Sequence, residues 1–126
     1  MNAPPVSPQT VPPIWAGLPL DRPRVMGVLN VTPDSFSDGG RVDPELAIVA
    51  GLAMQADGAD IVDVGGESAR PGALPTAPEI ERARILPVIT ALAAAGVRVS
   101  VDTCHAETMA AALAGKPQNV IAPDSY

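Results

Sequence analysis

The sequence has few of the residues that cross-link a chain or bind nucleic acid. Cys104 is the only cysteine among 126 residues, so neither an internal disulfide nor a cysteine cluster for a metal is available. Trp15, Phe36 and Tyr126 are the only aromatic residues, so aliphatic side chains must build the core. Fourteen acidic and eight basic residues give a net charge of −6, which argues against a nucleic-acid partner because phosphate binding needs clustered Lys and Arg.

Long hydrophobic runs are also missing. No apolar segment approaches the roughly 18 residues needed to cross a membrane, and the N-terminus has neither the basic nor the apolar region of a signal peptide. We therefore expect a cytoplasmic protein with no membrane partner. Lys116 is the only lysine beside seven arginines, which favours bidentate recognition of anions over mobile point charges.

The rest of the sequence alternates between strand and helix patterns. Residues 1–22 form a proline-rich lead-in, in which Ile14–Leu20 is suited to a short strand or hairpin arm, and residues 23–126 form the main domain. The patterns predict strands at Arg24–Val31, Asp60–Gly65 and Val97–Val101, helices at Pro44–Asp57, about Pro78–Ala95 and about Ala106–Ala114, and a fourth short strand around Asn119–Ala122.

Local signals mark the start of two of these helices. Asp43 followed by Pro44 combines an N-cap residue with proline at the first helical position. Thr76 or a neighbour is expected to cap the second helix, and Pro87 should kink that helix or shift its start.

The alternation implies an α/β fold with parallel strands and right-handed crossover helices. A TIM barrel has eight βα units and about 250 residues, whereas this sequence supplies three units and part of a fourth. The pattern therefore predicts either a small open sheet or the first half of a (β/α)8 barrel, and periodicity alone does not choose between them.

Polar side chains stand at or near the C-terminal ends of the three longer strands. They are Asn30, Asp63 and Asp102. The carboxyl ends of parallel strands meet at one edge of a sheet, where α/β folds place their active sites. Asp63 and Asp102 lie in runs of valine and isoleucine, where an ionised carboxylate is unfavourable unless hydrogen bonds or charges compensate. The alternative is structural: each carboxylate accepts hydrogen bonds from loop N–H groups.

The loop after the second strand, GGESARPGA, adds an arginine between small residues. Arg70 is able to bind a carboxylate or phosphate through two hydrogen bonds, or it is an ordinary surface arginine. Glu67 is expected to pair with Arg70 or to support the loop. The loop lacks the G-x-G-x-x-G spacing of a dinucleotide site.

Two further groups carry weaker signals. Ser35 and Ser68 have no evident histidine or aspartate partner for a nucleophilic triad. Cys104 and His105 are adjacent and are the only Cys and His of the chain, which is too few for a structural zinc site. We interpret them as a buried thiol and an imidazole at a helix N-terminus.

Three segments, taken together, resemble dihydropteroate synthase. They are MGVLNVTPDSFSDGG (26–40), GADIVDVGGESARPGA (58–73) and VRVSVDT (97–103), in this order and at these intervals. The resemblance covers roughly residues 23–115. It implies a TIM barrel that acts in folate biosynthesis and joins 6-hydroxymethyl-7,8-dihydropterin pyrophosphate to p-aminobenzoate, with Mg²⁺ on the leaving group. Sulfonamides compete for the p-aminobenzoate position in this family.

The resemblance also implies roles for single residues. Asn30 corresponds to the Mg²⁺ ligand, Asp102 to a pterin-binding carboxylate and Arg70 to the arginine that binds p-aminobenzoate and pyrophosphate. Members of the family have a mobile first loop that closes over the substrates and makes an apolar contact to the benzoate ring. This loop corresponds to Asp34, Ser35 and Phe36. The remaining assignments are Ser68 as a substrate-binding residue and Asp63 and Glu67 as supporting residues.

Three departures limit what the resemblance implies. Ala69 stands where many members have a hydroxyl-bearing residue, and KPQNVIAPDSY (116–126) is out of register with the family's next strand, so Asn119 is not assigned to the pterin. The family draws further pterin and pyrophosphate ligands from a later half-barrel. We therefore expect the 126 residues alone to be inactive or nearly so. A non-catalytic pterin-binding or interaction module, a homodimer formed through an open strand edge, and a related folate–corrinoid methyltransferase remain alternatives.

Overall fold

The computed structural model describes residues 11, 13–68, 70–115 and 117–122. The expected proline-rich lead-in falls largely outside these residues, as do Ala69 and the last four positions of the chain. In the described part of the chain, none of the helices is long and apolar enough to span a membrane.

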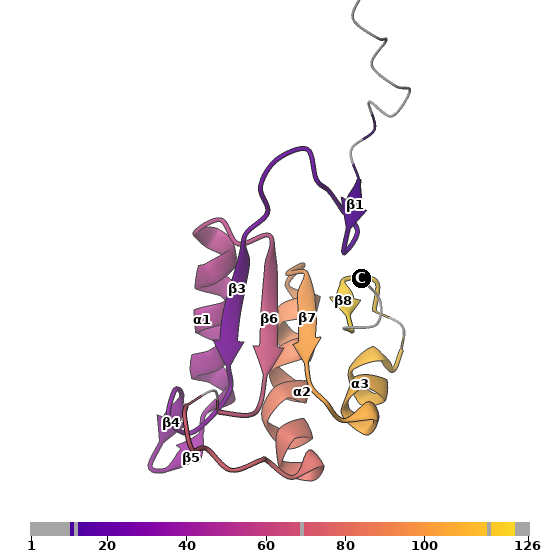
Figure 1. Cartoon of the computed structure of the whole chain (residues 1–126). Helices are drawn as coiled ribbons and strands as arrows, with labels where there is room; N and C mark the ends of the chain where they lie inside the picture. Colours follow the sequence, from indigo (N-terminus) through magenta and orange to yellow (C-terminus); the bar gives the residue numbers. More distant parts are fainter. Residues whose placement is uncertain (1–10, 12, 69, 116, 123–126) are drawn as a thin grey trace, which may run out of the picture.

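A parallel sheet of four strands, in the order β3-β6-β7-β8, forms the centre of the fold (Figure 1). The connecting helices are α1, α2 and α3 in chain order. The predicted α/β class and all the predicted strands and helices are confirmed, with boundaries that differ by no more than two residues. The strands are β3 (Met26–Asn30), β6 (Ile61–Gly65), β7 (Val99–Asp102) and β8 (Val120–Ile121), and the helices are α1 (Pro44–Ala56), α2 (Pro78–Ala94) and α3 (Ala106–Leu113).

Helices α1 and α2 lie behind the sheet in the view of Figure 1 and cover one of its faces. The core between the layers is aliphatic, as the shortage of aromatic residues predicts. Alternate strand residues point into it, and Leu29, Val62, Val64, Val99 and Val101 are all at most 1% exposed. Because side chains alternate along a strand, the residues between them face the other side of the sheet.

A hairpin covers the N-terminal end of that other side. It consists of β1 (Ile14–Trp15) and β2 (Leu18–Pro19), which confirms the hairpin expected at Ile14–Leu20. Its turn residues Ala16 and Gly17 have φ of 52° and 77°, and Arg98 donates a 3.1 Å hydrogen bond to the Ala16 carbonyl. A small apolar cluster of Ala16, Ile61 and Ile121 holds the hairpin against the sheet.

Helices α1 and α2 both begin where predicted, at Pro44 and Pro78, but only α1 has a side-chain cap. The Asp43 carboxylate accepts a 2.9 Å hydrogen bond from the Glu45 N–H, and Pro44 follows it. The N-cap of α2 is Ala77, a neighbour of Thr76 as expected, but it makes no side-chain hydrogen bond. The Thr76 N–H instead donates to a glutamate of the preceding loop. Helix α2 continues through Pro87 without a shifted start.

One element was not expected from the sequence. The first polar loop folds into a second hairpin, with β4 (Ser37–Asp38) antiparallel to β5 (Arg41–Val42). Gly39 and Gly40 form its two-residue turn with φ of 63° and 85°. Positive φ at both central residues is the type I′ pattern that matches the twist of paired strands.

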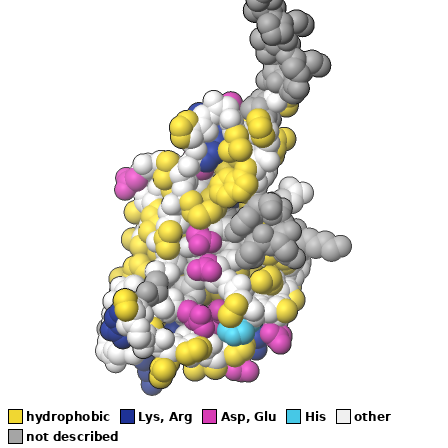
Figure 2. Space-filling model, in the orientation of Figure 1, with side chains coloured by type: hydrophobic (Ala, Val, Ile, Leu, Met, Phe, Trp, Pro, Cys, Tyr) yellow, Lys and Arg dark blue, Asp and Glu magenta, His cyan; other side chains and the backbone are white. Residues whose placement is uncertain are grey.

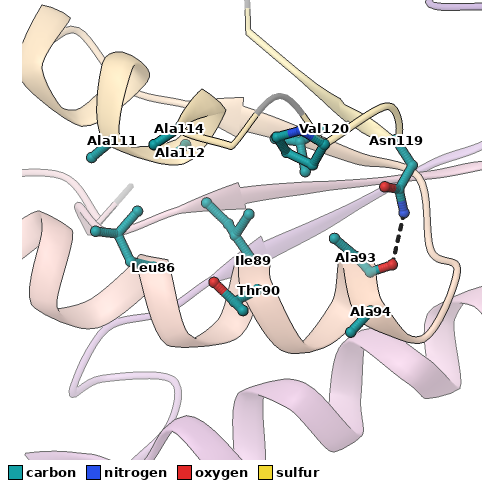
Figure 3. Close-up of a pocket in the computed structure, with 11 residues that line it drawn as sticks. Leu86, Ile89, Thr90, Ala93, Ala94, Ala111, Ala112, Ala114, Asn119 and Val120 are labelled. Carbon is teal, nitrogen blue, oxygen red and sulfur yellow. Dashed lines mark hydrogen bonds between the residues drawn. The ribbon is translucent and has the colours of Figure 1, made fainter.

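The last strand is fastened to the end of α2. The Asn119 amide donates to the carbonyls of Ala93 and Val97 at 2.9 and 2.8 Å, and the first of these bonds is drawn in Figure 3. A mostly apolar cavity of about 330 Å³ lies beside it, between α2, α3 and β8 (Figure 3). Asn119 therefore lies at the N-terminal end of β8, away from the C-terminal strand ends.

Candidate functional site

The strand register aligns the predicted strand-end residues in two rows on the face that α1 and α2 leave uncovered. Asn30 pairs with Gly65 and Gly65 with Asp102, so these three form one row. Asp63 lies in the preceding row, between Val28 and Ser100. Neighbouring strands are about 4.8 Å apart, so the backbones of Asn30 and Asp102 are separated by about 10 Å. Figure 2 shows acidic side chains gathered in the middle of this face.

Gly65 makes room for the carboxylate beside it. A Cβ atom at this position would lie 3.1 Å from Oδ2 of Asp102 and 3.4 Å from its Cβ. Glycine therefore lets the Asp102 side chain lie over the neighbouring strand, toward Asn30. A larger residue would displace the carboxylate from the space between the two polar side chains.

Asp102 is exposed, and its carboxylate has no hydrogen bond or ion pair to another described residue. Partial burial by the surrounding strand ends, and then the negative charges of Asp63, Glu81 and Glu67, raise its pKa above the usual value. The site therefore disfavours the ionised carboxylate in the absence of a ligand. A ligand that offers N–H donors or positive charge would relieve this cost.

Asp63 is held differently. Its Oδ1 accepts a 2.5 Å hydrogen bond from the hydroxyl of Ser100, which is fully buried on β7. This bond joins β6 to β7 on the open face of the sheet, which is the face that α1 and α2 leave uncovered. The structural alternative for Asp63, a carboxylate satisfied by hydrogen bonds, is therefore partly correct, although the donor is a strand side chain and not a loop N–H.

A hydrogen bond joins the two polar loops. The Ser68 hydroxyl donates to Oδ2 of Asp34 at 2.8 Å, and the same oxygen of Ser68 accepts from the Arg70 N–H at 3.2 Å. Hydrogen bonds from Ser68 and Thr32, followed by the Asp34 backbone N–H and the charge of Arg70, hold the pKa of Asp34 below its usual value. An ionised Asp34 therefore connects the first loop to the second.

These loops enclose a cavity of about 320 Å³. Arg70 and Arg84 bring two guanidinium groups to its wall, together with Asp34 and Ser68. Arg84 also donates a 2.9 Å hydrogen bond to the Gly66 carbonyl, which fixes the start of the second loop to α2. The cavity is therefore able to take an anionic group, with Asp34 limiting how much negative charge is accepted.

The remaining predicted residues do not line this cavity. Glu67 accepts a 2.9 Å hydrogen bond from the Thr76 N–H and so joins the two ends of the second loop. The Ser35 hydroxyl accepts a 3.4 Å hydrogen bond from Thr32. Phe36 packs against the main core, so a contact between its ring and a substrate would require the first loop to move.

The structure adds residues that the sequence did not single out. Thr32 is 1% exposed and its carbonyl accepts from the N–H groups of Ser35 and Phe36, which shapes the first loop. Arg84 and Glu81 come from α2, and their sequence positions give no sign that they reach the strand ends.

The interpretation of Cys104 as a buried thiol is wrong because it is exposed, whereas His105 is the N-cap of α3 as predicted.

Asn30 fits a cation that is shared with a substrate and does not fit a closed metal site. In the described residues no group of three or more His, Cys, Asp or Glu side chains could hold a metal ion. The Asn30 side chain is partly exposed on the open face and makes no hydrogen bond to another described residue. One amide oxygen suits Mg²⁺, which keeps most of its waters and takes further oxygens from substrate phosphates.

Comparisons with known proteins agree with this arrangement. The family model described as "Pterin binding enzyme" matches residues 26–121. The chain is 60% identical over 91 residues to dihydropteroate synthase from Mycobacterium leprae, which covers 71% of this chain and 32% of the relative. The chain thus spans about a third of the length of that curated relative.

Solved structures extend the likeness to three dimensions. Dihydropteroate synthase from Xanthomonas albilineans with 4-aminobenzoic acid aligns with a TM-score of 0.74 and 50% identity, over 85% of this chain and 41% of the other. The Burkholderia cenocepacia enzyme complexed with 7,8-dihydropteroate aligns with a TM-score of 0.68 and 39% identity, over 82% and 34%. Since these neighbours are TIM barrels, the four strands correspond to part of such a barrel. With its family model matched from β3 to β8, the chain belongs to the pterin binding enzyme family.

Proposed function

We propose that this chain supplies the pterin-binding part of a dihydropteroate synthase in folate biosynthesis. The observation that carries the proposal is the Asp102 carboxylate, which lies on the open face without a partner among the described residues and has a raised pKa. The edge of a pterin ring presents several N–H donors, which would satisfy this carboxylate. The relatives with bound 4-aminobenzoic acid and 7,8-dihydropteroate support the same assignment.

The pyrophosphate of the pterin substrate would lie between Asn30 and the second loop. Asn30 would offer one oxygen to a Mg²⁺ ion held mainly by phosphate oxygens and water. Arg70 is exposed at the cavity wall, where its guanidinium is able to pair with a departing pyrophosphate or with the carboxylate of p-aminobenzoate. Mg²⁺ would supply electrostatic stabilisation of the leaving group, and the protein would orient the two substrates and exclude water.

The hydrogen bond between Ser68 and Asp34 joins the two loops. The joined loops would lie beside the p-aminobenzoate that attacks the pterin methylene carbon. Ser35 and Phe36 belong to the same loop, and we propose that they approach the substrate when the loop rearranges. Asp63 and Glu67 would support the site through Ser100 and Thr76.

The 126 residues alone are proposed to bind pterin with little or no turnover. The alignments cover only 32% and 41% of two of the matched enzymes, and the remaining βα units would close the barrel over the open face. The closest rival function is a non-catalytic pterin-binding or interaction module, which the open carboxylate row would also serve. A homodimer and a cytoplasmic location remain part of the proposal.

Pterin titration of the purified chain and an assay for dihydropteroate formation test the proposal together. We expect saturable binding of the pterin pyrophosphate that is enhanced by Mg²⁺, with binding lost in Asp102→Asn and weakened in Asn30→Ala. Asp57→Asn, which removes an exposed carboxylate after α1, is the matched control and should bind normally. No pterin binding by the folded chain would overturn the proposal, and rapid turnover would overturn the expected inactivity. Size-exclusion chromatography with and without ligand measures the proposed dimer.

A further inference from the structure

A thiol, an imidazole and a buried carboxylate form a chain of contacts next to the open face. Cys104 Sγ lies 3.8 Å from Nε2 of His105, and Nδ1 of the same ring lies 3.1 Å from Oε1 of Glu81. Cys104 and His105 follow β7, whereas Glu81 comes from α2. The fold therefore assembles this chain of contacts from two elements that are distant in sequence.

Glu81 is ionised and fixed. Its side chain is 1% exposed, and Oε1 also accepts a 2.7 Å hydrogen bond from the Thr103 hydroxyl. Burial alone would raise the pKa of Glu81, but the hydrogen bonds from Thr103 and His105 outweigh burial and lower it. A carboxylate that is ionised at neutral pH accepts a hydrogen bond and does not donate one.

The state of Glu81 determines the tautomer of His105. Because Oε1 accepts, the proton of the neutral imidazole lies on Nδ1, and the lone pair of Nε2 then faces the thiol. The backbone N–H of His105 also donates a 3.0 Å hydrogen bond to Thr103, which fixes the residue that carries the ring. The thiol is exposed to solvent, so a reagent is able to reach it.

This order of groups is that of an activated nucleophile: a nucleophile beside a base, and a third group that orients the base. Cys104 also directly precedes the N-cap of α3, where the helix dipole favours negative charge. We propose that Cys104 is a nucleophilic thiol that exchanges with small disulfides, with His105 as its general base and Glu81 as the positioning residue. This proposal does not depend on the proposed function.

The exchange step conserves atoms and electrons. The Sγ proton passes to Nε2 of His105 as Sγ attacks one sulfur of a disulfide R–S–S–R. The bond from Sγ to that sulfur forms while the S–S bond breaks, and the departing RS⁻ takes up a proton from the imidazolium or from water. Cys104 is oxidised to a mixed disulfide and the other half of the reagent is reduced to a thiol. The adduct would lie two residues from Asp102 and so beside the open face.

The aromatic disulfide dithiobis(nitrobenzoate) tests the proposal because it releases a coloured thiolate. Cys104 is the only cysteine, so the folded chain should release one thiolate per molecule, and Cys104→Ser should release none. We expect the folded chain to react roughly five to ten times faster than the same chain unfolded in urea. Reaction of the folded chain at or below the unfolded rate would overturn the proposal without the need for any variant.

Three variants separate the roles of the groups. His105→Gln should lower the folded rate to the unfolded level, and Glu81→Gln should lower it about twofold to threefold because the imidazole loses its anionic partner. Glu107→Gln is the matched control, since it removes an exposed carboxylate from the first turn of the same helix and should leave the rate unchanged. Equal rates for His105→Gln and the unchanged chain would exclude general-base catalysis, and a large effect of Glu107→Gln would show that charge alone controls the rate. Far-UV circular dichroism shows whether each variant is folded.

Discussion

The two faces of the central sheet are built from the same strands and differ in almost every physical property. On the helix-covered face, Val62, Val64, Val99 and Val101 are completely buried in the main apolar core. On the other face, Val28 is 58% exposed and Asp102 has a raised pKa. Alternation with a period of two residues produces both environments within strands of four or five residues.

This difference between the faces shows which one stabilises the fold and which one carries the candidate site. The covered face supplies burial and close packing, which stabilise the folded state. The open face carries groups whose properties are unfavourable without a ligand. Substitutions on the two faces should therefore separate stability from binding, with the largest loss of stability on the covered face.

Leu92→Ala should give the largest loss of stability. Leu92 on α2 is completely buried in the main core, so truncation should lower the free energy of unfolding by about 2–5 kcal/mol. Urea unfolding followed by circular dichroism measures the loss. Leu74→Ala is the control, since Leu74 is 85% exposed and its removal should change stability by less than about 0.5 kcal/mol. Equal losses at the two sites would mean that the covered face is not the source of stability.

Gly51→Ala should give the next largest loss. A Cβ atom at Gly51 on α1 would lie 2.8 and 2.9 Å from the two methyl carbons of Leu92. The clash should cost about 1–3 kcal/mol, against a gain of about 1 kcal/mol from the helix propensity of alanine. Combined with Leu92→Ala, the added methyl enters the cavity, so the double variant should lose less than the sum of the two single losses. Additive losses would indicate that the two helices do not touch at Gly51.

The periodicity of the sequence explains how much of the covered face could be predicted. The apolar runs that contain Leu29, Val64 and Val101 predicted the strands, and Asp43–Pro44 predicted the start of α1, because these signals are local. The cap of α2 lies next to Thr76 as expected, but the sequence did not show that the Thr76 N–H donates to Glu67, a tertiary contact across the second loop.

The open face was predicted in part. Strand ends and the family resemblance pointed to Asn30, Asp63 and Asp102, and the parallel register places Asn30 and Asp102 in one row. The contacts of Glu81 and Arg84 depend on how α2 packs against the sheet. The sequence around each strand end does not predict these contacts, because each contact joins α2 to a residue about 20 positions away.

Glu81, at the start of α2, should give an intermediate, pH-dependent effect. Glu81→Gln should lower stability at pH 7 by about 1 kcal/mol, because the hydrogen bonds to an anionic acceptor are replaced by weaker ones. The folded-state pKa of Glu81 lies below its ordinary value of 4.5. The advantage of the unchanged chain should therefore be complete above about pH 4.5 and disappear as the pH falls through the lower folded-state pKa.

Urea unfolding of both chains between pH 7 and pH 3 measures this difference. Comparison with the variant at each pH cancels the titration of the other carboxylates. A difference that stays constant down to pH 3 would show that Glu81 is not the anionic partner of Thr103 and His105.

Asp102→Asn should have the smallest effect on stability, and of the opposite sign. Partial burial and the nearby carboxylates raise the folded-state pKa of Asp102, so its ionised form destabilises the fold above that pKa. The neutral amide should raise the melting temperature slightly at pH 7, and this gain should vanish as the pH falls below the unfolded value of 3.8. Pterin binding should be lost in the same variant. A parallel loss of stability and binding would place Asp102 with the structural residues, whereas a gain in stability with lost binding shows that the open face keeps an unfavourable charge for its ligand.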